Sequence, residues 1–192
     1  FQVNEDFQDR HDVFVTQNAN LIVCLEAQTG VHFDTANWGQ VPNLGAVLAL
    51  SLPLTKAVLS FDGALSKGSF RGGIAEQLAI AVSQENRCSY CLAAHTATAG
   101  AYRVSAEDTA DARIARASDP KTAAALRFAQ LVVRTRGHVD QADISAARDA
   151  GWEDADIIEI VGHVIATTLT NYLHHISEVP VDFPAVDFAS DE

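Results

Sequence analysis

The sequence predicts an all-α fold, and three of its features support this prediction. Alanine is abundant, runs of β-branched residues are short, and apolar residues recur at intervals of three and four. That interval is the period of an amphipathic helix, and alanine is the strongest helix former. With 192 residues, 48% of them hydrophobic, the chain is long enough to bury one sizeable core. We therefore expect a single helical domain over residues 1–192.

The first half of the chain contains four runs with helical periodicity. They cover about residues 16–28, 43–50, 54–67 and 72–84. Gly30 and Gly68 follow the first and third runs, and Gly72 begins the fourth; glycine is typical of helix ends. The segment VHFDTANWGQVPN, between the first and second runs, is aperiodic. We therefore expect it to run over the surface or over a neighbouring subunit.

The second half contains five further predicted helices, at about residues 88–101, 106–116, 120–136, 141–150 and 153–177. Ser105, with Asp108 three residues later, resembles a helix cap followed by an acidic first turn. Asp119 before Pro120 is another start signal. The tail EVPVDFPAVDFASDE is aperiodic, and we expect it to pack on the domain or on a neighbouring subunit.

The charge of the chain argues against some classes of partner. Acidic residues outnumber basic ones by 25 to 13, which gives a net charge of −12 at pH 7. Such a chain repels phosphate and anionic lipid, so we expect it to bind neither nucleic acid nor membranes. The sequence also lacks an apolar run of membrane-spanning length, and its first residues, FQVNEDFQDRHD, do not resemble a signal peptide. We expect a cytoplasmic protein.

The chain has three cysteines, and two of them lie in the segment ENRCSYCLAAH. An odd number argues against a framework of structural disulfides, and we interpret Cys24, in NLIVCLEA, as a small buried apolar residue. Cys88 and Cys91 are three residues apart, and His95 follows four residues later. On a helix this spacing places all three on one face. The free backbone N–H groups of a first helical turn favour a thiolate, and His95 is placed to accept the Cys91 proton directly or through one water.

A carboxylate is needed to orient such a histidine. If SQENR reverses the chain between two antiparallel helices, Glu76 lies ten residues before Asn86 and His95 lies nine residues after it. The two side chains would then sit at the same height, and Glu76 could fix the tautomer of the imidazole and raise its basicity. Glu85, at the turn itself, would be at the wrong height.

Other interpretations of these residues remain open. The two cysteines and His95 could supply three zinc ligands, with a fourth from elsewhere, or the cysteines could be inert core residues. Tyr90 is most simply a packing residue whose hydroxyl finds a partner. On the last predicted helix, His163, Thr167, Asn171 and His174 form a polar stripe. This stripe either contacts a second subunit, the more common case, or borders the active site. We interpret His138, His174 and His175 as structural.

The segment EQLAIAVSQENRCSYCLAAH resembles a known motif, a glutamate followed after eleven residues by Cys-x-x-Cys-x-x-x-His. It is the core motif of the AhpD-like alkylhydroperoxidases, within the carboxymuconolactone decarboxylase family. VPNLGAVLALSLPLTKAVL and TNYLHHISEVPVDFP are similar to other parts of the peroxidase-related branch, so the resemblance covers about residues 41–184. It implies an AhpD-like helical bundle with the CxxC motif at the start of a core helix, and assembly into trimers or hexamers.

The resemblance also implies roles for the motif residues. Cys91 would be the peroxidatic thiol, Cys88 the resolving thiol, His95 the base of a proton relay, and Glu76 the residue that positions it. Well-studied members have a histidine immediately before the second cysteine, where this chain has Tyr90.

The resulting functional hypothesis is a thiol-dependent antioxidant peroxidase. Cys91 would reduce an organic hydroperoxide, Cys88 would close a disulfide, and a lipoyl or thioredoxin-like dithiol would reduce it again. We expect no cofactor and no metal ion. One alternative is a thiol-disulfide oxidoreductase or redox sensor with weak peroxidase activity. A lactone decarboxylase is less favoured, because that branch of the family is not characterised by the CxxC pair, and a binding protein with inert cysteines is a further alternative.

Overall fold

The structure is a computed structural model that describes residues 42–190. The helix predicted at residues 16–28 and Cys24 lie outside the described residues. Residues 42–190 form α-helices and two short 3-10 turns, with no strand among them, which confirms the predicted fold class. The elements are α3 (Asn43–Ala49), α4 (Leu52–Leu65), α5 (Gly73–Glu85), α6 (Ser89–Ala99), η1 (Gly100–Tyr102), α7 (Ala106–Asp111), η2 (Ala112–Ile114), α8 (Pro120–Thr135), α9 (Gln141–Asp149) and α10 (Asp154–Ser177).

Every helix predicted within the described range is present, and the differences lie at the ends. The helix predicted at residues 54–67 begins two residues earlier, because the Ser51 side chain accepts a hydrogen bond from the Leu54 N–H and a proline occupies the first turn. The helix predicted at 106–116 is shorter: α7 passes into η2 and stops at Ala115, whose φ is +53°.

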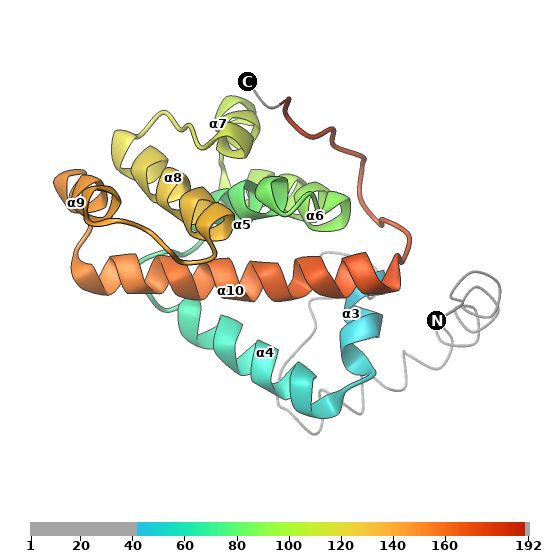
Figure 1. Cartoon of the computed structure of the whole chain (residues 1–192). Helices are drawn as coiled ribbons and strands as arrows, with labels where there is room; N and C mark the ends of the chain where they lie inside the picture. The colour runs from blue at the N-terminus through green and yellow to red at the C-terminus, as the bar shows by residue number, and fades with distance from the viewer. Residues whose placement is uncertain (1–41, 191–192) are drawn as a thin grey trace.

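The long helix α10 runs through the middle of the molecule, as Figure 1 shows. The hairpin of α5 and α6, together with α8, covers one side of α10, and α3 with α4 lies on the other side. Helix α5 contacts α6, α8 and α10. Its residues Gln77 to Gln84 are all buried, so α5 is the central element of the fold.

The main core forms where α5, α8 and α10 meet. Leu78, Ile80, Leu126 and Ile160 are almost completely inaccessible to solvent. The Phe70 ring, just before α5, stacks on Trp152 at 4.5 Å between ring centroids. Close packing of this kind fixes the height and rotation of α5, which carries Glu76.

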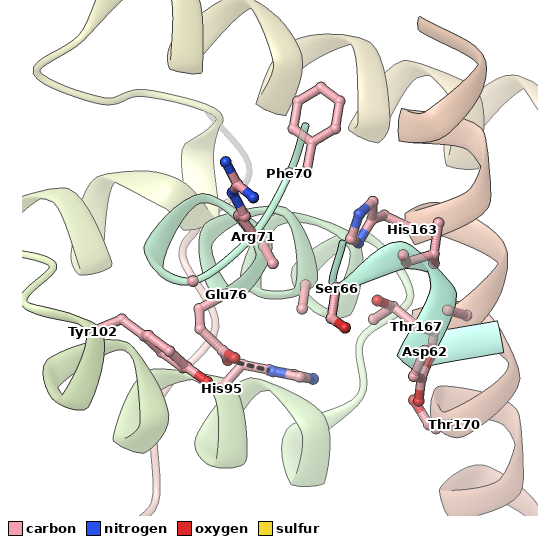
Figure 2. Close-up of a pocket in the computed structure, with 15 residues that line it drawn as sticks. Asp62, Ser66, Phe70, Arg71, Glu76, His95, Tyr102, His163, Thr167 and Thr170 are labelled. Atoms are coloured by element: carbon pink, nitrogen blue, oxygen red, sulfur yellow. Dashed lines mark hydrogen bonds and ion pairs between the residues drawn. The ribbon is translucent and has the colours of Figure 1, made fainter. Parts of the chain in front are cut away.

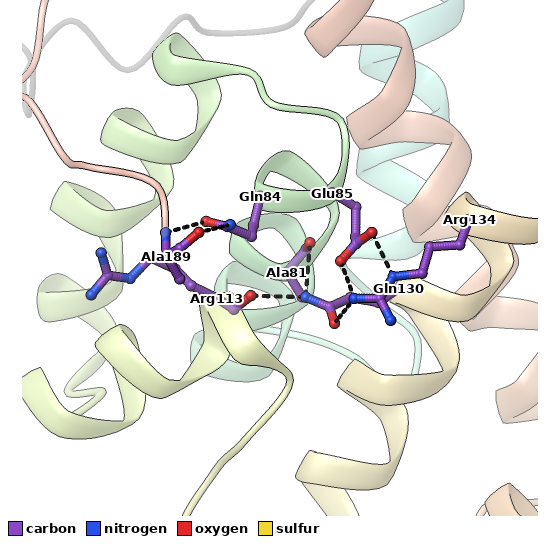
Figure 3. Close-up of polar contacts among 7 residues, drawn as sticks. All are labelled: Ala81, Gln84, Glu85, Arg113, Gln130, Arg134 and Ala189. Carbon is purple, nitrogen blue, oxygen red and sulfur yellow. Dashed lines mark hydrogen bonds and ion pairs between the residues drawn. The ribbon is translucent and has the colours of Figure 1, made fainter. Parts of the chain in front are cut away.

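Polar contacts around the C-terminal half of α5 hold it to its neighbours (Figure 3). Arg134 of α8 forms a two-pronged ion pair with Glu85, with Nε 2.7 Å and Nη2 2.5 Å from the carboxylate oxygens. The buried Gln130 donates to the carbonyl oxygens of Ala81 and Arg113. Glu85 therefore pairs with Arg134 and not with His95, in line with its expected height at the turn.

Residues 178–190 run back over the same domain. Asp182 accepts hydrogen bonds from the backbone N–H and the side-chain amide of Asn43, each at 2.8 Å. The Gln84 side chain bonds to the backbone of Ala189 at both its amide nitrogen and its oxygen. The tail therefore packs on its own domain.

Among residues 42–190, no single helix has both the length and the apolar character to cross a membrane. The bent pair of α3 and α4 meets the length and composition criteria only when the two helices are taken together.

Candidate active site

The α5–α6 turn brings the two cysteines to the start of α6. Arg87 adopts a left-handed conformation with φ +56°, and the Cys88 N–H bonds to the Ser83 carbonyl at 2.9 Å. Helix α6 then begins at Ser89, which makes Cys88 the cap residue and places Cys91 in the first turn. The chain reversal expected at SQENR is confirmed, and the CxxC motif lies at a helix start.

Both cysteines are reduced and buried. Their electrostatic surroundings differ. A hydrogen bond from the Cys91 thiol is the largest cause that lowers the pKa of Cys88; burial opposes it, and His174 and the Cys91 backbone add to it. The pKa of Cys91 is raised, first by its hydrogen bond to Cys88 and then by burial. In the reduced pair, these contacts favour a thiolate on Cys88 over one on Cys91.

Glu76 and His95 meet across the α5–α6 hairpin. The Glu76 Oε2 and His95 Nδ1 atoms are 2.7 Å apart, and the side chains are 15% and 31% exposed. Burial lowers the pKa of His95, but the hydrogen bond and charge of Glu76, with contributions from Asp62 and Cys88, outweigh it, so the pKa is raised. The contact expected from the spacing around Asn86 is present, and the catalytic role of the pair remains a prediction.

The structure does not show direct proton transfer between Cys91 and His95. Within the described part of the chain, Cys91 has hydrogen-bond partners on α10 outside the cysteine pair: Thr170, whose Oγ1 lies 3.7 Å from Sγ, and Asn171. We therefore expect the proton of Cys91 to reach His95 by the other route, through one water molecule.

A cavity of about 450 Å³ lies beside the Glu76–His95 pair. Figure 2 shows this pair on one wall and His163, Thr167 and Thr170 of α10 on another. Because Thr170 also contacts Cys91, Cys91 is the cysteine next to the cavity. Apolar groups supply part of the wall, among them Leu65, Phe70, Ala75 and Ala79. A small organic molecule in this space would meet both the relay pair and the neighbourhood of Cys91.

The polar stripe on α10 faces this site, which decides between the two alternatives left open by the sequence. His163 and Thr167 line the cavity. Asn171 is fully buried; it accepts a hydrogen bond from Asn86 in the α5–α6 turn and donates one to Ser83. Burial lowers the pKa of His163, against the opposing charge of Glu159. The stripe therefore borders the candidate site, the second of the two expectations.

His174 is the residue of the site whose position the sequence did not reveal. Its Nδ1 lies 3.7 Å from the Cys88 sulfur, and its Nε2 lies 3.2 Å from the Val179 carbonyl oxygen. The contact with Cys88 spans 86 residues. The only signal in the sequence was membership of the polar stripe, and the interpretation of His174 as merely structural overlooked its contact with a reactive atom.

Tyr90 packs between neighbouring elements and its hydroxyl has hydrogen-bond partners, as expected from the sequence. Its hydroxyl donates to Asp182 and accepts from the Leu44 N–H. Its ring lies 5.1 Å from that of His174. Burial is the largest cause that raises the pKa of this hydroxyl, so Tyr90 stays neutral. It links α6 to α3 and to the tail.

Metal binding by the two cysteines and His95 is one of the alternatives that the sequence allows. Within residues 42–190, no cluster of three or more His, Cys, Asp or Glu side chains has a geometry able to hold a metal ion. Cys88, Cys91 and His95 therefore do not form the three-ligand set that their spacing in the sequence allowed.

Comparisons with known proteins concern the family and the fold. Residues 53–134 match the model of the carboxymuconolactone decarboxylase family. Proteins of curated function provide no match. The structure of an AhpD-core peroxidase-related protein from Ralstonia eutropha JMP134 is similar, with a TM-score of 0.67 and 26% identity over 80% of this chain and 81% of that one.

Two further structures share the fold. A peroxidase-related protein from Silicibacter sp. TM1040 has a TM-score of 0.67 and 22% identity, covering 84% of this chain and 85% of its own. A debrominase crystallised with 2,3,4-tribromopyrrole has a TM-score of 0.61 and 16% identity, covering 77% and 80%. Residues 53–134 therefore match the carboxymuconolactone decarboxylase family, and the described helices have an AhpD-like fold.

Proposed function

We propose that the protein is a thiol peroxidase that reduces organic hydroperoxides with the Cys88/Cys91 pair. One observation carries the proposal: Cys91, at the start of α6, contacts Thr170, and Thr170 lines the same cavity as the Glu76–His95 pair. The family and its peroxidase-related members support an oxidoreductase of this type.

The first chemical step is the attack of Cys91 on the peroxide. Cys91 sits beside the cavity, and its proton passes to the Cys88 thiolate or, through water, to His95. The Cys91 thiolate attacks one oxygen of the O–O bond, an S–O bond forms, and the alkoxide leaves. The His95 imidazolium, stabilised by Glu76, supplies the proton that converts the alkoxide into the alcohol.

The second step closes the disulfide. The Cys88 thiolate attacks the sulfur of the Cys91 sulfenic acid, and hydroxide leaves and is protonated to water. The two thiols have then lost two electrons, and the hydroperoxide has gained them as alcohol and water. An external dithiol, such as a lipoyl group or a thioredoxin-like protein, returns both cysteines to the reduced state.

The lowered pKa of Cys88 favours one alternative function. A thiolate held at a helix start is the usual nucleophile of thiol-disulfide exchange. In that case the protein would exchange disulfides with a partner, and hydroperoxides would be poor substrates.

Thiol counting separates the two functions. The reduced protein is treated with one equivalent of cumene hydroperoxide, free thiols are counted before and after, and the linked peptides are identified by mass. We expect the loss of two thiols per chain and a Cys88–Cys91 linkage. A pair that resists the hydroperoxide, yet oxidises readily with a small disulfide, would support the exchange function and contradict the peroxidase.

A further inference from the structure

His174 stands between two groups that together fix its protonation. A carbonyl oxygen can only accept a hydrogen bond, so the Nε2 atom that faces the Val179 carbonyl at 3.2 Å must carry a hydrogen. In the neutral ring, Nδ1 is then the bare nitrogen, and Nδ1 is the atom that faces the Cys88 sulfur at 3.7 Å. The backbone therefore holds His174 in the tautomer that can take a proton from Cys88.

The position of Cys88 makes such a base necessary. Its side chain is completely buried, and an isolated charge there is costly. A protonated imidazole beside the sulfur supplies the compensating charge. His174 itself is only partly buried, so its proton can exchange with solvent.

We propose that His174 is the base of the resolving cysteine: it takes the proton of Cys88 and holds the thiolate until that thiolate attacks oxidised Cys91. This inference rests on the proposed function, since it concerns the second step of that reaction. In this step the S–S bond forms, the S–O bond of the sulfenic acid breaks, and the His174 imidazolium gives its proton to the leaving hydroxide, which becomes water. Each cysteine would then have its own histidine, His95 for Cys91 and His174 for Cys88.

The titratable groups around His174 are consistent with this role. Cys88 and Tyr90 face it from the start of α6, and His175 and Glu178 lie near it on α10 and at its end. Asp182 is one step away, on the Tyr90 hydroxyl. The contact with Cys88 is the largest cause that raises the pKa of His174, burial opposes it, and Val179 and Glu178 add to it.

The first test compares His174→Gln with His175→Gln. Glutamine can still donate to the Val179 carbonyl but cannot accept a proton, and exposed His175 makes a matched control on the same helix. Thiolate absorbance at 240 nm is followed against pH in the reduced proteins, with Cys24 retained in all of them. We expect the first thiolate midpoint to rise by about one pH unit or more in His174→Gln and to stay unchanged in His175→Gln.

The second test follows the oxidation itself. Reduced protein is mixed with cumene hydroperoxide and dimedone, and the trapped Cys91 sulfenic acid is compared with the disulfide. We expect His174→Gln to raise the ratio of trapped adduct to disulfide on the order of tenfold at neutral pH, with Cys88→Ser as the positive control. A wild-type ratio in His174→Gln, with an unchanged thiolate midpoint, would overturn the proposal.

A third measurement needs no variant of His174. Its imidazole is titrated by NMR in the reduced wild type and in Cys88→Ser. We expect the pKa to be lower by about one unit in Cys88→Ser, where no thiolate can form; equal values would overturn the proposal. The two titrations use no oxidant, so they test the role of His174 even if the protein does not react with the hydroperoxide. A failure to react would contradict only the proposed peroxidase function.

Discussion

At the scale of single residues, the site depends on two contacts between a histidine and its partner. Glu76 and His95 are 2.7 Å apart, and their meeting was predictable because it follows from one chain reversal and the rise of a helix. His174 and Cys88 are 86 residues apart in sequence. Their contact depends on how α10 packs against the hairpin, which no local pattern specifies.

Glu76→Gln should keep the fold but slow the oxidation of Cys91. The amide fills the same space, but without the carboxylate charge, burial lowers the pKa of His95, and less imidazolium is present near neutral pH. We expect the rate of thiol loss with cumene hydroperoxide at pH 7 to fall on the order of tenfold. Glu85→Gln is the matched control, since Glu85 pairs with Arg134. Equal rates for the two variants would show that Glu76 is not part of the relay.

The same change should alter how stability depends on pH. A histidine whose pKa is raised by folding stabilises the folded state below its unfolded pKa, and this contribution is lost as pH rises through the folded value. Glu76→Gln should therefore lower the melting temperature at pH 5–6 more than at pH 9. Calorimetry at both pH values measures this, and a uniform decrease would contradict the assigned shift of His95.

The two cysteines should be chemically unequal. Cys91→Ser should abolish hydroperoxide turnover, because the residue next to the cavity is lost. Cys88→Ser should still allow one oxidation of Cys91, which leaves a sulfenic acid that dimedone traps, but it should stop repeated turnover. If Cys88→Ser instead prevents the first oxidation and Cys91→Ser does not, the two roles are exchanged, in line with the thiolate on Cys88 in the resting pair.

At the scale of elements, the sequence predicts the helices well and their ends less well. Within residues 42–190 the periodic runs are all helices. The errors arise where a cap or a left-handed residue moves a boundary, at Ser51 and Ala115. Those features depend on single side chains and backbone angles, which periodicity does not report.

Replacing Gly72 or Gly63 by alanine should change the stability of the protein in opposite directions. Gly72, before α5, has φ +61° and ψ −131°, a conformation that L-residues avoid. Gly63 lies inside α4 with open space where a Cβ would be. We expect Gly72→Ala to destabilise the protein by about 1–3 kcal/mol and Gly63→Ala to stabilise it by up to about 1 kcal/mol. Urea unfolding measures both, and a neutral Gly72→Ala would mean that α5 does not need this turn.

At the scale of the whole molecule, α10 has a face that remains exposed among residues 42–190. Ile158, Ile165, Tyr172 and Ile176 are between 54% and 77% exposed, and their spacing of seven, seven and four places them along one side of the helix. The opposite side of α10 contacts the cysteine site. An apolar line of this length is typical of a surface that contacts another molecule.

We therefore predict a homo-oligomer that buries this face of α10. Light scattering coupled to size exclusion should give a mass that is a multiple of 20.5 kDa, and the double variant Ile158→Glu/Ile165→Glu should lower that mass. Ile114→Glu, at an exposed apolar residue on η2, is the control and should leave it unchanged. A wild-type mass near 20.5 kDa at every concentration would contradict the prediction.

Residues 178–190 are made after all the described helices, so the site is completed late during synthesis of the chain. The contacts of Asp182 with Asn43 and Tyr90 join segments 139 and 92 residues apart, and His174 and Val179 beside Cys88 come from the same late part of the chain. A ribosome that adds about 5–20 residues per second needs roughly 5–20 s to proceed from Cys91 to Asp182. For that interval the nascent chain presents both thiols without the histidine and the cover that control Cys88. A newly made molecule thus passes through a stage in which its cysteines have ordinary reactivity, and the distinction between them arises only when the tail has been made.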